Sequence, residues 1–202
     1  MKVLIACEES QRLCIGFRAF GHDAFSCDIK PCSGGFPQWH IQDDALKLLK
    51  FKWDIIIAHP PCTYLSNAGA CRLYPQKGVL DYSRYELGLA AKKFFMEFYN
   101  CSCSRVCIEN PLPSKIFDLP SPSQIIQPYY FGDHFSKKTL LWLRGLPLLT
   151  FTNIVSHRPF IACGTSRYKG NKEKAGIVRS AVDRSKTFSG IALAMVTQWG
   201  IN

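Results

Sequence analysis

The sequence predicts an α/β fold with a mostly parallel sheet flanked by helices. Short runs of branched apolar residues, typical of buried strands, alternate along the chain with longer segments of helical periodicity. Such alternation favours crossover connections and therefore parallel strands. The length of 202 residues favours a single domain over residues 1–202, and a hydrophobic fraction of 47% is usual for a globular protein.

The elements follow from these patterns in chain order. Strands are expected at residues 2–7, 23–28, 53–58, 105–109 and 139–143, a short strand or turn at 43–49, and another strand at Tyr130 and Phe131. Helices are expected at residues 11–20, with Ser10 as N-cap, at 82–99 and at 189–199, and one short helical piece lies in the proline-rich stretch 112–128.

The stretch 54–62, Asp-Ile-Ile-Ile-Ala-His-Pro-Pro-Cys, is the most informative. Its apolar run reads as a central strand that must end at Pro60 and Pro61, since proline cannot donate to a sheet ladder. Cys62 then lies just beyond the carboxyl end of a strand, where open α/β sheets place ligands and chemistry. We expect Cys62 to be a nucleophile. His59 could be a general base, a substrate contact or an ordinary loop histidine.

A second strand end carries Glu109, Asn110 and Pro111. Because parallel strands end at one edge of a sheet, Glu109 and Cys62 are expected at neighbouring strand tips. A thiolate there could attack a substrate with acid assistance from the carboxyl group.

Acidic residues also follow the first strands. The first strand leads into Cys7 and Glu8, the second ends at Asp28, and Asp44 follows the third segment. Asp28 could bind ribose hydroxyls, and Asp43 or Asp44 could accept from an adenine amino group; a plain turn and a helix cap are the alternatives. The first turn lacks the Gly-x-Gly-x-x-Gly phosphate fingerprint, which favours an uncharged nucleoside cofactor such as S-adenosylmethionine over a dinucleotide.

The net charge of +10 is concentrated in residues 137–186, where only Glu173 and Asp183 oppose the basic residues. This distribution favours a nucleic-acid partner, with Arg158 and Arg167 as phosphate contacts in a loop-like stretch, over a merely solvated basic surface.

The ten cysteines are expected to be reduced thiols. Cys101, Cys103 and Cys107 match no common zinc spacing, so no metal site is expected. No signal peptide and no apolar run long enough to span a membrane are recognised, which favours the cytoplasm.

Asp-(Ile)3-Ala-His-Pro-Pro-Cys and Ile108-Glu109-Asn110-Pro111 together resemble the Pro-Cys and Glu-Asn motifs of DNA (cytosine-5)-methyltransferases, most of all the short phage- and prophage-encoded members. The stretch from Phe131 to Thr139, with Lys137 and Lys138, is similar in place to the family's basic DNA-contacting motif. The segment from Ser189 is similar to its last motif.

The resemblance implies a Rossmann-like S-adenosylmethionine-dependent methyltransferase fold in the cytoplasm of a bacterial, phage-bearing host. Cys62 would add to C6 of cytosine and Glu109 would hydrogen-bond N3, on a base flipped from the DNA duplex. The remaining roles it implies are cofactor binding by Cys7, Glu8, Asp28, Asp44 and Pro60, and substrate binding by Pro61, Asn110, Lys137 and Lys138, together with Arg158 and Arg167.

Two departures from the family leave other functions open. The first turn is altered, and residues 144–188 offer only a short basic insert in place of a large target-recognition domain. The alternatives are a catalytically idle methyltransferase fold that binds nucleic acid or a nucleotide, and a methylase of free cytosine nucleotides.

Overall fold

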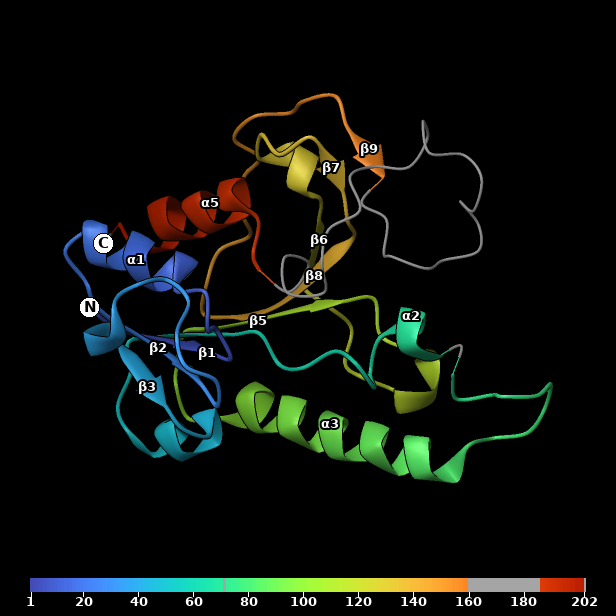
Figure 1. Ribbon diagram of the computed structural model, residues 1–202. Helices are drawn as coiled ribbons and strands as arrows, with labels where there is room; N and C mark the ends of the chain where they lie inside the picture. Colours follow the sequence, from blue (N-terminus) through green and yellow to red (C-terminus); the bar gives the residue numbers. More distant parts are fainter. Residues whose placement is uncertain (71, 160–185, 202) are drawn as a thin grey trace.

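The protein is a seven-stranded mixed sheet with helices on both faces, seen here in a computed structural model that describes residues 1–70, 72–159 and 186–201 (Figure 1). The strands of the sheet are β1 (Lys2–Ala6), β2 (Asp23–Asp28), β3 (His40–Gln42), β4 (Ile55–Ala58), β5 (Val106–Pro111), β6 (Gln124–Ile126) and β8 (Thr139–Arg144). The α-helices are α1 (Arg12–Ala19), α2 (Asn67–Ala70), α3 (Tyr82–Asn100) and α5 (Ser189–Trp199). The 3-10 helices in the described part of the chain are η1 (Pro37–Trp39), η2 (Ala45–Lys50), η3 (Lys115–Phe117) and η4 (Pro128–Tyr130).

The strand order is β3-β2-β1-β4-β5-β8-β6. The first five strands in this order run parallel, whereas β8 is antiparallel to both β5 and β6. The order reverses between β1 and β4, which is the switch point where such sheets bind ligands at the carboxyl ends of their strands. The predicted α/β architecture is confirmed: a Rossmann-like, mostly parallel sheet flanked by helices.

Each face of the sheet is buried under helices. Helices α1 and α5 cover one face and α3 the other (Figure 1). On the α1 and α5 face, Ile5, Phe17 and Met195 belong to one apolar cluster; on the α3 face, Phe95 and Ile108 belong to a second. Because both faces are covered, β1 and β4 are buried throughout after Lys2, which explains their continuous apolar runs.

Helix α5 lies against α1 although nearly the whole chain separates them. Gly16 of α1 has no side chain, and a Cβ there would press into Val196 of α5. Nη1 of Arg12 donates to the carbonyl of Thr187, just before α5. The two ends of the described chain are thereby joined on one face of the sheet.

A small lobe extends from the β8 side of the sheet. Strands β7 (Phe135–Ser136) and β9 (Arg158–Pro159) pair in parallel there. Tyr129 stacks on His157 with ring centroids 3.8 Å apart, and Tyr130 stacks on Phe151 at 4.2 Å. Both tyrosines therefore pack within the lobe.

Several local predictions differ from the structure, including the short strand or turn expected at 43–49, where β3 ends at Gln42 and η2 follows. Tyr130 and Phe131 do not form a strand, since Pro128 begins the 3-10 helix η4 there. The strand β6 was not predicted. Ser10 is not the N-cap of α1; Gln11 takes that position, in a left-handed conformation with φ of 57°.

The predicted division into one domain with a basic insert at 144–188 stays a prediction, because residues 160–185 lie outside the described part of the chain. Within the described residues, no helix is both long and apolar enough to cross a membrane.

Candidate active site at the strand tips

Three strand ends meet at the candidate site. β4 lies between β1 and β5, and the register pairs Ala58 with both Ala6 and Ile108. The next residue on each flanking strand is Cys7 and Glu109. The prediction that Glu109 and the Cys62 loop reach the same edge of the sheet on neighbouring strands is confirmed in this topology.

The residue beside Glu109 is His59, and the two form a buried pair. Nδ1 of His59 lies 2.9 Å from Oε2 of Glu109, and the side chains are only 10% and 13% exposed. Burial alone would lower the pKa of His59, but the hydrogen bond and charge of Glu109, with the charge of Glu8, raise it overall. Burial would raise the pKa of Glu109, but the bond from His59 and the charge of Lys137 lower it overall.

The backbone around this pair is held by further hydrogen bonds. The N–H of His59 donates to the carbonyl of Ala6 at 2.9 Å. Nδ2 of Asn110 donates to the carbonyl of Pro60 at 3.0 Å. Asn110 is only 3% exposed, so its amide group serves to tie β5 to the turn after β4.

Cys62 lies at the start of a short turn beyond the two prolines. Its carbonyl accepts hydrogen bonds from the N–H groups of Leu65 and Ser66, at 3.2 and 2.9 Å. The N–H of Ser114, from the segment after β5, donates to the carbonyl of Leu65 at 2.7 Å. The half-buried thiol of Cys62 therefore stands on a loop that is fastened to the continuation of β5, while Pro61 is exposed.

Glu8 is buried, and its carboxylate accepts hydrogen bonds from the helix that follows it. Its side chain accepts hydrogen bonds from the N–H groups of Leu13, at 2.8 Å, and Cys14, at 3.4 Å, in the first turn of α1. Burial raises the pKa of Glu8 to about 7, against the lowering effects of His59, these two N–H groups and Arg12. Both carboxylate oxygens are used by the protein itself, so the predicted cofactor contact of Glu8 stays a prediction.

The tips of β1, β2 and β3 bring two carboxylates close to Cys7. Burial, followed by the charges of Asp28, Cys27 and Asp44, raises the pKa of the Cys7 thiol well above its ordinary value. Oδ1 of Asp28 accepts from the N–H of Lys30, and Oδ1 of Asp44 accepts from the N–H of Leu46 as the cap of η2. The turn and cap alternatives thus both occur, each using one oxygen of the carboxylate.

The turn after β1 has an unusual backbone. Cys7 has a φ of 59°, in the left-handed region that normally favours glycine. The side chain of the buried Gln11 then exchanges two hydrogen bonds with the backbone of Phe36, at 2.8 and 3.1 Å, which ties the loop after β2 to the start of α1. This turn replaces the glycine-rich loop of dinucleotide-binding folds.

The predicted substrate-binding residues are distributed unevenly. Lys137 lies close enough to influence the charges of both Glu109 and His59, and its ammonium group is 5.8 Å from the ring centroid of Phe188. Lys138 is exposed on the same segment. The backbone of Arg158 lies in β9, and Arg167 lies outside the described residues.

Sequence reasoning did not find the bond between His59 and Glu109 or the capping role of Glu8. One signal was present: His59 and Glu109 each follow the last apolar residue of a predicted parallel strand. Neighbouring strands with the same end point place such residues side by side.

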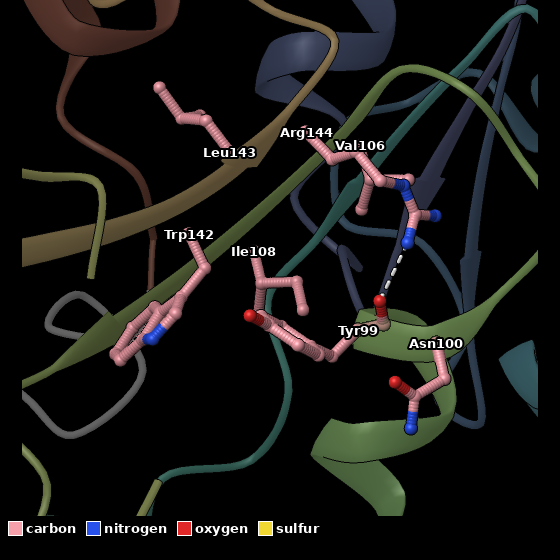
Figure 2. A pocket seen from close by; sticks show the side chains of 7 residues that line it. All are labelled: Tyr99, Asn100, Val106, Ile108, Trp142, Leu143 and Arg144. Atoms are coloured by element: carbon pink, nitrogen blue, oxygen red, sulfur yellow. Dashed lines mark hydrogen bonds between the residues drawn. The ribbon is translucent and has the colours of Figure 1, made fainter. Parts of the chain in front are cut away.

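A cavity of about 270 Å³ lies elsewhere, on the α3 face near the start of β5 (Figure 2). Tyr99 and Trp142 contribute its aromatic walls. Arg144 closes one side and donates to the carbonyls of Tyr99 and Cys101, at 2.7 and 2.6 Å. Since Glu109 lies at the other end of β5, this cavity is separate from the candidate site. Among the described residues, no three His, Cys, Asp or Glu side chains are grouped to hold a metal ion.

The chain shows only limited similarity to known proteins. No family model and no curated protein matches the chain. Among solved structures, the chain is similar to a triple mutant of DNMT2 from Spodoptera frugiperda, with 13% identity and a TM-score of 0.35 over 77% of this chain and 54% of that one. The chain thus spans about half the length of that protein.

Proposed function

We propose that this protein is an S-adenosylmethionine-dependent methyltransferase that methylates C5 of cytosine in DNA through a covalent adduct with Cys62. The observation that carries the proposal is the placement of a thiol and a buried carboxylate on adjacent, mutually fastened strand ends. Glu109 lies near the end of β5, and Cys62 lies on the turn that follows β4, beside the switch point of the sheet.

The two side chains have complementary tasks in this reaction. The thiolate of Cys62 adds to C6 of the ring, while the carboxyl group of Glu109 protonates N3 and so stabilises the added state. C5 then becomes nucleophilic enough to accept a methyl group. Loss of the C5 proton and departure of Cys62 restore the aromatic ring.

The cofactor proposal rests on the tips of β1, β2 and β3. The carboxylates of Asp28 and Asp44 both act on Cys7, and Pro60 borders the same edge from β4. When bound, S-adenosylmethionine supplies an electrophilic methyl group on a cationic sulfonium. An edge with two carboxylates and no phosphate-binding loop fits such a cation, and either carboxylate can accept from ribose hydroxyls.

The nucleic-acid proposal rests on the basic side of the site. Lys137 lies close enough to lower the pKa of Glu109, and we infer that its charge would meet a phosphate next to a flipped base. Further predicted phosphate contacts follow Lys137 in the sequence: Lys138, Arg158 and Arg167. Pro61 is exposed beside Cys62 and would contact the substrate, whereas Asn110 supports the turn that carries the thiol.

A second candidate is a methyltransferase-type fold that binds nucleic acid or a nucleotide without turnover. It is favoured by the ion pair between His59 and Glu109, which holds the carboxylate ionised and occupied in the free protein. A methylase of free cytosine nucleotides is a variant of the first proposal with a smaller substrate.

The test is covalent capture with 5-fluorocytosine, which cannot lose a proton from C5. The wild-type protein is incubated with S-adenosylmethionine and with 5-fluorocytosine in a duplex, a single strand or a free nucleotide, and adducts are measured by mass spectrometry. An adduct on Cys62 is expected with the duplex and is lost in Cys62→Ala. The matched control is Cys101→Ala, since Cys101 is half-buried at the other end of the sheet. Binding of DNA and cofactor without any adduct or methyl transfer would favour the idle fold.

A further inference from the structure

The pair formed by His59 and Glu109 determines where the proton needed for the proposed reaction lies in the free protein. Protonation of N3 requires a proton on Glu109. In the free protein, however, the hydrogen bond from His59 and the charge of Lys137 lower the pKa of this carboxyl group below its ordinary value despite burial. Glu109 therefore begins as a carboxylate at neutral pH and must obtain a proton during the reaction.

The nearest proton is on the ring of His59. Nδ1 of His59 lies 2.9 Å from Oε2 of Glu109, which is the separation of a direct hydrogen bond. The charged groups that act on the ring are Glu109 on β5, Glu8 before α1 and Lys137 before β8. The two carboxylates raise its pKa and outweigh both burial and the lysine. The pair thus shares one proton between two groups, and the raised pKa of His59 with the lowered pKa of Glu109 favours its place on the imidazole.

A purely structural role explains His59 less well. Its backbone is already fixed by the carbonyl of Ala6, and the following turn is fixed by Asn110. A buried ion pair generally adds little net stability compared with apolar side chains of similar size. In addition, Nε2 of His59 is buried and finds no hydrogen-bond partner among the described residues, which is a cost that packing alone does not offset.

We propose that His59 is a positioning residue that stores a proton for Glu109 and supplies it when cytosine is attacked. This inference rests on the proposed function. As the bond between Sγ of Cys62 and C6 forms, the C5–C6 π electrons shift into the ring, and N3 takes the proton of the Glu109 carboxyl group. Glu109 in turn receives the Nδ1 proton of His59, which becomes neutral. When Cys62 leaves, N3 returns the proton through Glu109 to His59, while the C5 proton is lost to solvent.

The decisive variant is His59→Asn. The amide N–H of Asn can occupy the place of Nδ1–H and donate to Glu109, but it cannot give up its proton. We expect adduct formation with 5-fluorocytosine DNA to slow on the order of 10²-fold near neutral pH, the usual scale for a proton-transfer partner. The rate should recover as the pH is lowered, because Glu109 can then take its proton from solvent. Loss of folding is checked by circular dichroism of the same variant.

A second measurement needs neither substrate nor turnover. The protonation of the His59 ring is followed by nitrogen NMR in the wild-type protein and in Glu109→Gln, with His59→Asn used to assign the signal. We expect the pKa of His59 to fall in Glu109→Gln, since its main charged partner is lost.

The outcomes separate the two proposals. An unchanged His59 pKa in Glu109→Gln, or a His59→Asn variant with the wild-type pH profile, would overturn the proton-store role and leave the methyltransferase proposal intact. Absence of any adduct in the wild-type protein would overturn the proposed function, and the proton-store role with it. A shifted pKa together with an acid-shifted profile supports both.

Discussion

Replacing the buried Glu8 by Gln is expected to remove the part of the pH dependence of the unfolding free energy that comes from the titration of Glu8. Glu8 is 5% exposed, and burial raises its pKa from 4.5 to about 7. A raised pKa means that the folded state binds the proton more tightly than the unfolded state. The stabilisation is therefore fully present below about pH 4.5 and is lost as the pH rises to about 7.

The size of this effect follows from the shift. Each tenfold change in proton affinity corresponds to about 1.4 kcal/mol, so the rise to a pKa of about 7 corresponds to about 3 kcal/mol. Gln at this position stays neutral and keeps one oxygen to accept from Leu13. The stability of Glu8→Gln relative to the wild-type protein should therefore increase by about 3 kcal/mol between acidic and mildly alkaline pH.

The assay is urea unfolding followed by circular dichroism at several pH values between about 5 and 8. Glu9→Gln is the matched control, because it removes the same charge from the neighbouring, half-buried position. The reasoning fails if the difference in unfolding free energy between Glu8→Gln and the wild type is constant over this range, or if Glu9→Gln shows the same increase.

Two further variants test the packing that supports the site. Asn110→Ala should lower the free energy of unfolding by about 1–3 kcal/mol in urea, since the buried carbonyl of Pro60 loses its donor; the exposed Asn100→Ala is the control, and equal effects would contradict this account. Gly88→Ala places a Cβ inside the ring of Phe117, so the thermal midpoint should fall, with an overpacking cost of about 1–3 kcal/mol. A rise in midpoint would mean that the helix-forming preference of Ala, up to about 1 kcal/mol, outweighs the clash.

Long periodic segments made much of the fold predictable. The strand Asp23–Asp28 and the helix Ser189–Trp199 agree with the predicted bounds, because mostly apolar residues fill the centre of each segment. The strand Gln124–Ile126 was missed: three residues are too few to show a period, and it is set only by pairing with β8. Tyr130 and Phe131 were expected to form a strand, whereas Pro128 begins a 3-10 helix there.

The sequence was sufficient to predict which strand ends carry the candidate site. Prolines at the end of β4 and of β5 located Cys62 and Glu109 at one edge, since a parallel sheet brings all such ends together. The bond from His59 to Glu109 was not predictable in the same way, because it depends on the register of two strands and on side-chain rotamers. The capping role of Glu8 depends on the left-handed turn at Cys7 and Gln11. No glycine in this turn indicates from the sequence that the backbone is left-handed there.

The packing of α5 on α1 has a consequence for how the protein is made. Helix α1 is translated early, but the apolar surface it shares with Met195 and Val196 is covered only when α5 has left the ribosome. Until then, the apolar surface that α5 covers in the folded protein is exposed to chaperones and to neighbouring nascent chains. The nascent chain is therefore expected to remain incompletely folded until α5 has been made, because only then is this face of the sheet fully covered.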